Sequence, residues 1–450
     1  MELKNSSIFL DIQVNGGSGL LFNDINTIDE FLKIELNYLK YGKSFIIPTF
    51  ITDSNEKLQK FIDIILQRIA LSNKKYVING NTVILPKLFG VHFEGPFITN
   101  KGTHPEKYLK KLNKENLNNF IQIIKPLQDI NIYFTFAPEL LEDINLLDLL
   151  KDNFKNITIS AGHTKITEKD FKELQDKLEQ NKIKMLTHFH NAMLGGHFVN
   201  GACGIPNYVV NNGFSGYFGM IADGQHTNKG ELLPMLLNYS NNICVVSDGA
   251  SPSCCKIDEN NNLFTMGGNI AVVEQKEGEL PCFFWTDFSK NKDFCEKDVN
   301  KIYEMYVSGK GGYKTLAGSA IHLLQSFEFL RNINIEKELE KIKQNEIMQD
   351  LFEGGLKKNN LKIDDVQDFI NKNLYKMFVK NPVKALGVDN EFFEYEFIDG
   401  VLWKNGEKYV DFECNFVEFL DVVGGNCDGL RCELMERLSD VVENGLLQCK

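Results

Sequence analysis

Short apolar runs alternate with longer amphipathic segments from the start of the chain to about residue 250. The runs have the length of buried parallel strands, whereas the longer segments repeat apolar residues every three or four positions, as helices do. The eight predicted strands span residues 8–14, 44–49, 88–93, 132–136, 157–161, 184–187, 217–221 and 243–247. The predicted helices between them span residues 28–41, 57–71, 114–124, 140–151, 168–180 and 229–239.

This alternation predicts an α/β fold, a TIM-like (β/α)8 barrel whose functional site lies at the carboxyl ends of the strands. An open doubly wound sheet is the rival, but no GxGxxG sequence follows the first strand. The barrel takes residues 1–390, including an insertion at about 251–315 with a hairpin of 263–265 and 270–273. We interpret the insertion as a surface excursion, with a lid over the site or an interface as the alternatives. Residues 391–450 predict a small β appendage and a terminal helix at 432–448.

Charge and composition narrow the range of partners. The 450 residues include 49 basic and 61 acidic side chains, for a net charge of −12, and no basic stripe suits a nucleic-acid backbone. No apolar stretch is long enough to span a membrane and the start has no signal-peptide core, so we expect a cytoplasmic protein. The ten cysteines form no CxxC pair, as expected of reduced thiols. Nucleic acid and membrane are therefore not expected partners, while a homodimer stays open.

Polar, chemically versatile side chains stand at the ends of five predicted strands. They are Glu94, His163, His188, His226 and Asp248. Because the carboxyl ends of barrel strands share one rim, we expect these groups to converge there. Imidazole nitrogens and carboxylate oxygens bind zinc-like divalent ions, and three protein ligands with one open position form a catalytic site.

Spacing alone does not choose every ligand. His92 lies two residues before Glu94 and His190 two residues after His188, so each pair shares one face of its strand. Any one of these histidines is also compatible with an ordinary hydrogen-bonded polar residue at a strand end. Only the joint pattern indicates a metal site.

Six ordered segments resemble motifs of the N-acetylglucosamine-6-phosphate deacetylase family, within the amidohydrolase superfamily. They are GVHFEGP at 90–96, KGTH at 101–104, SAGH at 160–163, THFHNAM at 187–193, IADGQH at 221–226 and VSD at 246–248. The resemblance implies a metal-dependent hydrolase that converts N-acetylglucosamine 6-phosphate to glucosamine 6-phosphate and acetate. The family also places strands of a small β-sandwich before its barrel, so the appendage of this chain is expected to be reduced.

The resemblance also implies roles for individual residues. The implied metal ligands are Glu94, His163 and His188, and the implied catalytic residues are Asp248, as acid and base, and His104 near the scissile amide. The candidate substrate contacts are His226, Asn191 and Ala192, to which we add Gln13 and His197. The first strand carries Gln-Val-Asn at 13–15, where many superfamily members carry His-x-His. Neutral amides are poor ligands, so we predict one divalent ion per chain, zinc first and iron as the alternative.

The loop after the NAM motif departs from the family pattern. Members usually grip the sugar phosphate there with an arginine, but residues 194–201 read LGGHFVNG. The imidazole of His197 is a weaker phosphate ligand than a guanidinium group. Either other groups hold the phosphate, such as Lys101 or a partner subunit, or the substrate is an unphosphorylated N-acyl sugar or a cyclic amide. A catalytically silent scaffold that kept the fold is the remaining alternative.

Overall fold

Eight parallel strands form the central sheet of the computed structural model, which describes residues 7–78, 81–178, 183–198, 202–227, 230–257, 262–266, 269–276, 279–286, 314–388 and 390–412. In spatial order they are β1 (Phe9–Val14), β4 (Ser44–Ile51), β7 (Val91–Glu94), β8 (Ile132–Phe136), β9 (Ile157–Ala161), β10 (Met185–Leu186), β11 (Tyr217–Ile221) and β12 (Ile243–Val246). A parallel bridge between Val14 and Gly249 brings the two edges together. The predicted TIM-like barrel is confirmed, and the strands lie where the apolar runs placed them.

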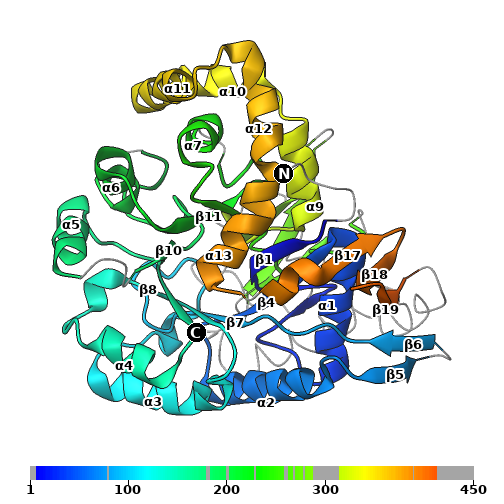
Figure 1. Cartoon of the computed structure of the whole chain (residues 1–450). Helices are drawn as coiled ribbons and strands as arrows, with labels where there is room; N and C mark the ends of the chain where they lie inside the picture. The colour runs from blue at the N-terminus through cyan, green and yellow to red at the C-terminus, as the bar shows by residue number, and fades with distance from the viewer. Residues whose placement is uncertain are drawn as a thin grey trace, which may run out of the picture.

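Helices cover the outside of this sheet (Figure 1). They are α1 (Ile28–Gly42), α2 (Asn55–Leu71), α3 (Lys114–Ile124), α4 (Leu146–Asn153), α5 (Glu168–Lys177), α6 (Ile205–Asn212) and α7 (Leu232–Tyr239). Thr27 begins α1 with a capping box that includes Glu30, which satisfies free backbone N–H groups of the first turn. The helix expected at 140–151 begins only at Leu146, and α6 was not predicted.

Aromatic packing ties the helices to the strands. The ring of Phe120 in α3 lies 5.6 Å from that of Phe93 in β7 and 5.5 Å from that of Phe134 in β8. All three side chains are buried. Such close-packed interiors resist displacement, so the carboxyl ends of the strands are held in fixed positions.

Further helices follow the barrel strands in the chain. They are α9 (Leu323–Arg331), α10 (Ile335–Ile342), α11 (Glu346–Asn359), α12 (Val366–Tyr375) and α13 (Asn381–Leu386). α9 contacts α1 and β12, while α11 packs against α7. Among the described residues, no helix is both long and apolar enough to cross a membrane.

The insertion forms a four-stranded antiparallel sheet of β13 (Leu263–Met266), β14 (Asn269–Glu274), β15 (Cys282–Thr286) and β16 (Lys314–Leu316). The predicted hairpin is confirmed, since Leu263 pairs with Val272. The interpretation of the insertion as a surface excursion is wrong. Apolar residues of this sheet pack with Ile51 at the end of β4, and Met266 and Phe284 line the cavity at the barrel mouth.

The C-terminal appendage is a three-stranded antiparallel sheet of β17 (Tyr395–Ile398), β18 (Val401–Lys404) and β19 (Glu407–Asp411). An unpredicted hairpin, β5 (Lys75–Ile78) with β6 (Asn81–Ile84), contacts it through β6 and β19 (Figure 1). β6, which lies between the second and third barrel strands in the chain, therefore meets β19, which follows all eight. The helix predicted at 432–448 lies outside the described residues.

Candidate active site and metal centre

A cavity of about 460 Å³ opens at the carboxyl ends of the barrel strands. All the predicted site residues except two line it, namely Glu94, His104, His163, His188, Asn191, Ala192, His226 and Asp248. Convergence follows from the fold, because each of these residues ends a strand or lies in the loop that follows one. The barrel thus gathers side chains that are up to 154 positions apart in the chain, from Glu94 to Asp248.

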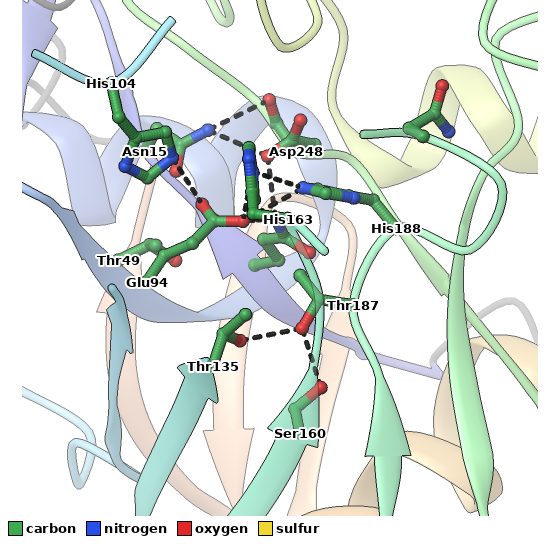
Figure 2. Close-up of polar contacts among 12 residues, drawn as sticks. Asn15, Thr49, Glu94, His104, Thr135, Ser160, His163, Thr187, His188 and Asp248 are labelled. Carbon is green, nitrogen blue, oxygen red and sulfur yellow. Dashed lines mark hydrogen bonds and ion pairs between the residues drawn. The ribbon is translucent and has the colours of Figure 1, made fainter. Parts of the chain in front are cut away.

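Three of the side chains meet at a single point (Figure 2). Oε1 of Glu94 lies 3.2 Å from Nε2 of His163 and 2.9 Å from Nε2 of His188, and the two nitrogens are 3.0 Å apart. All three residues are buried. Burial alone would raise the pKa of Glu94, but hydrogen bonds and charges from the two imidazoles outweigh it and hold that pKa well below its ordinary value.

The backbone at this point is unusual for residues that carry a side chain. His163, His188 and Asp248 have φ values of 48°, 27° and 50°, in the left-handed region that favours glycine. Each such residue costs on the order of 1–3 kcal/mol and persists only where the surrounding structure fixes it. Strain after three of the barrel strands, β9, β10 and β12, supports a functional role for the side chains that it directs.

The backbone sets the protonation of the His163 ring. Its Nδ1 lies 2.7 Å from the carbonyl oxygen of Asn100. A carbonyl oxygen only accepts hydrogen bonds, so Nδ1 carries a proton, and Nε2 is the ring nitrogen whose lone pair can bind a metal. Metal-binding histidines have this arrangement, in which the second nitrogen donates to a carbonyl or carboxylate group.

In the His104 ring the proton lies on the other nitrogen from that in His163. The ligand atoms of Glu94, His104 and His163 all lie within 4.8 Å of one another, so His104 is a geometric alternative to His188 as third ligand. However, the backbone N–H of Thr52 donates to Nδ1 of His104 at 3.2 Å. In a neutral imidazole the proton then lies on Nε2, and burial, with the nearby His163, lowers the pKa of His104 to about 3. His104 therefore faces the cavity as a hydrogen-bond donor.

The ligand atoms of Glu94, His163 and His188 fit a divalent cation. One carboxylate oxygen, of Glu94, and two imidazole nitrogens, Nε2 of His163 and Nε2 of His188, are directed at one point. The other ring nitrogen of His188, Nδ1, has no hydrogen-bond partner among the described residues. Three electron-pair donors in a buried pocket need positive charge between them, and this ligand set suits zinc or iron.

Asp248 is held by the side-chain amides of Gln13 in β1 and of Asn15 just after it, and Figure 2 shows Asn15 beside Asp248. Its Oδ1 accepts hydrogen bonds from Nε2 of Gln13 at 3.0 Å and from Nδ2 of Asn15 at 2.8 Å. Nε2 of Gln13 also lies 3.3 Å from Oε1 of Glu94. Burial raises the pKa of Asp248 to about 6, against the lowering effect of His188. The aspartate is thus fixed beside the cluster with a proton affinity suited to acid and base chemistry.

His226 is positioned by a residue that the sequence analysis did not single out. Asp223 accepts hydrogen bonds from the backbone N–H groups of Gln225 and His226 and lies against the His226 ring. The only available signal was its place in the IADGQH segment. The pair orients the imidazole at the cavity wall.

The structure decides between the paired histidines. Nδ1 of His92 lies 3.1 Å from the hydroxyl of Thr49 and its Nε2 lies 2.8 Å from that of Thr135, so His92 is a satisfied interior residue below Glu94. His190 contacts the rings of Phe189 and Phe198 instead of the cavity. His188, and not His190, joins the cluster.

Two predicted substrate contacts lie elsewhere. Gln13 is fully buried and joins the carboxylates of Glu94 and Asp248, and it does not line the cavity formed by the described residues. His197 lies outside that lining as well, with its Nδ1 2.9 Å from Oε1 of the buried Glu231. The sequence pattern could not show that Gln13 supports the site through hydrogen bonds to Glu94 and Asp248.

The remaining cavity wall is partly apolar, and the described residues give it no basic side chain. Apolar side chains of Ile51, Met266, Phe284 and Leu316 form one part, and three of these belong to the insertion sheet. No lysine or arginine occurs among the described residues that line the cavity. Lys101, a candidate for phosphate binding, pairs with Glu106 at 3.1 Å and is half exposed.

The fold and this cavity define a TIM-like barrel protein with a candidate metal centre at the face where such barrels carry their active sites. No family model matches the chain. The chain is 31% identical over 234 residues to N-acetylglucosamine-6-phosphate deacetylase of Rattus norvegicus, covering 50% of this chain and 52% of that protein. It is 26% identical over 251 residues to N-acetylgalactosamine-6-phosphate deacetylase of a Shewanella strain, covering 54% of this chain and 56% of that protein. It therefore matches about half the length of these relatives.

Solved structures agree with these relatives. N-acetylglucosamine-6-phosphate deacetylase of Pasteurella multocida matches with a TM-score of 0.59 and 20% identity, covering 90% of this chain and 86% of that one. N-acetylglucosamine-6-phosphate deacetylase of Thermotoga maritima matches with a TM-score of 0.57 and 20% identity, covering 90% of this chain and 88% of that one. The resemblance to this deacetylase family that the motifs indicated is confirmed, and the structural matches establish the shared fold.

Proposed function

We propose that this protein hydrolyses the acetamide of N-acetylglucosamine 6-phosphate to glucosamine 6-phosphate and acetate. The observation that carries the proposal is the fixed position of Asp248 beside the convergent Glu94, His163 and His188. The names of the relatives support the substrate class. A silent scaffold has no physical need for a buried, strained cluster of this kind.

In this proposal Glu94, His163 and His188 hold one divalent ion, with zinc as the first choice and iron as the second. When bound, such an ion supplies positive charge beside the amide carbonyl and lowers the pKa of water. Asp248 accepts a proton from the attacking water and returns it to the amide nitrogen as the carbon–nitrogen bond breaks. The free amine and acetate then leave.

The other residues bind and orient the substrate. Nε2–H of His104 donates a hydrogen bond to the oxygen that becomes negative as water adds to the carbonyl. His226, Asn191 and Ala192, which also line the cavity, fix the sugar. The insertion sheet closes the apolar side of the cavity and limits the access of bulk water to the reacting amide.

An unphosphorylated N-acyl sugar is the second candidate substrate. The described cavity lining supplies no lysine or arginine for a phosphate group, which favours this alternative. Acetate release from N-acetylglucosamine with and without the 6-phosphate separates the two. A clear preference for the phosphorylated sugar supports the main proposal, equal rates or the reverse preference support the alternative, and no release from either contradicts both.

A further inference from the structure

The backbone of Asp248 is strained and needs support from its surroundings. Its φ of 50° lies in the left-handed region that favours glycine, and a residue with a side chain keeps this conformation only where neighbouring groups fix it. The side-chain amides of Gln13 and Asn15 bind the carboxylate. The hydrogen bonds to the main chain at 247–249 fix the backbone that carries this carboxylate.

Two of these main-chain hydrogen bonds come from one residue, Ser319. Its hydroxyl group donates to the carbonyl oxygen of Ser247 at 2.5 Å, and its backbone N–H donates to the carbonyl oxygen of Asp248 at 2.9 Å. Ser319 is 1% exposed, so bulk water does not compete for these contacts. Ser319 therefore binds the peptide groups on both sides of the Asp248 Cα atom.

Gly318 allows Ser319 to approach this closely. Its φ is 67°, and a Cβ atom at this position would lie 2.8 Å from the carbonyl oxygen of Asp248. Glycine avoids both the clash and the strain. A parallel bridge between Gly249 and Ser319 extends the contact along the chain.

Other groups also bind this part of the main chain. Asp11 accepts a hydrogen bond from the backbone N–H of Ser247 at 3.1 Å. Nδ2 of Asn15 reaches the Asp248 carbonyl oxygen, but only at 3.5 Å, so Ser319 makes the closer contact with that oxygen. Ser319 is thus the residue that holds the carbonyl groups of both Ser247 and Asp248.

We propose that Ser319 is a positioning residue for the acid and base Asp248. It does not line the described catalytic cavity, so it acts through Asp248 and not on the substrate. This role rests on the proposed function, in which Asp248 moves the proton. Because Ser319 follows β16, it also links the insertion sheet to the acid and base.

Steady-state acetate release from the sugar that the wild type prefers tests this role. Ser319→Ala leaves the Ser247 carbonyl without its hydroxyl donor, so we expect kcat to fall about tenfold while KM changes by less than about twofold. Ser326→Ala is the matched control, because Ser326 is also buried but its hydroxyl group has no hydrogen-bond partner among the described residues. This control should keep its kcat.

The Asp248→Asn background separates positioning from a general structural defect. If Ser319 acts through Asp248, Ser319→Ala should lower the single-turnover rate about tenfold in the wild type and change it little in Asp248→Asn. Equal losses in both backgrounds, or an unchanged kcat in folded Ser319→Ala, contradict the role. Thermal unfolding checks the fold of each variant. If Ser319→Ala does not fold, Ser319→Cys takes its place, since a thiol is a weak donor, and an unchanged kcat there also contradicts the role.

Crystal structures of the wild-type chain and of Ser319→Ala give a readout that does not depend on activity. The Asp248 carboxylate should shift by about 1 Å relative to the amides of Gln13 and Asn15. An unmoved carboxylate contradicts the positioning role. Absence of acetate release from the wild type contradicts the proposed function instead, so the two failures are distinguishable.

Discussion

Nδ1 of His226 lies 2.7 Å from Oδ2 of Asp223, and the backbone N–H of His226 donates to the other oxygen of the same carboxylate at 2.8 Å. Both side chains are buried. Burial lowers the pKa of His226, but the charge and hydrogen bond of Asp223 outweigh it and raise that pKa. The carboxylate therefore fixes the ring and keeps a proton on Nδ1, which leaves Nε2 to face the substrate.

Asp223→Asn should raise KM more than it lowers kcat. The amide cannot hold the imidazole as the carboxylate does, so the sugar is positioned less well while Asp248 stays in place. We expect a rise in KM of about tenfold, or about 1.4 kcal/mol, in steady-state acetate release. The exposed Asp350→Asn is the control. An unchanged KM would show that Asp223 does not position the substrate.

Replacing two of the proposed ligands should abolish metal binding. The double variant His163→Ala with His188→Ala removes both imidazoles and leaves Glu94 as the only proposed ligand, which is too few for a divalent ion. Elemental analysis of the purified wild-type chain should find about one equivalent of metal, against almost none in the variant. His197→Ala, outside the cavity lining, should keep its metal. Metal retained by the double variant refutes the ligand assignment.

Asp248→Asn should lose activity without losing metal. An amide neither accepts the proton from water nor returns it to the leaving nitrogen, so kcat should fall about 100- to 10,000-fold. Single-turnover acetate release and elemental analysis on the same sample check both parts. Activity within a factor of two or three of the wild type would exclude Asp248 as the acid and base.

Asp11 should make stability depend on pH. Burial raises its pKa from 3.8 to about 7, against hydrogen bonds from Ser247. The folded state therefore holds a proton that the unfolded state releases, so this contribution is fully present below pH 3.8 and is lost as pH rises through 7. Between pH 5 and 8 the free energy of unfolding should fall by about 3 kcal/mol more in the wild type than in Asp11→Asn. Urea unfolding at both pH values measures this, and parallel pH profiles would contradict it.

Glu35→Gln should destabilise the barrel strongly. Arg68 is fully buried, and its Nε and Nη2 lie 2.5 and 2.9 Å from the two oxygens of Glu35. Removing the carboxylate charge leaves a buried guanidinium unpaired, at a cost of about 3–5 kcal/mol. Denaturant unfolding should show this loss, whereas Asp176→Asn in the exposed pair with Lys172 should change little. Equal effects of the two substitutions would contradict the prediction.

The sequence predicted the barrel well because its strands are local features. A strand buried on both faces is a short apolar run, and β8, β9 and β11 have the predicted ends. The hairpin of β5 and β6 was missed since its contact with β19 joins segments about 330 positions apart. Asp223 was missed because one acidic residue in a loop has no periodic signal.

The order of apolar runs and the polar residues that end them determined, without coordinates, the barrel, its functional rim and the set of candidate side chains. Spacing along the strands did not separate Glu94 from His92 or His188 from His190; the family resemblance favoured Glu94 and His188, and the tertiary structure supplied the physical reason. Alternation places His92 and Glu94 on one face, but the hydroxyls of Thr49 and Thr135 from neighbouring strands satisfy His92 below the rim. Left-handed φ values at His188 and His190 break the alternation after β10, and only His188 reaches Glu94. These choices depend on neighbours distant in the chain, which local patterns do not encode.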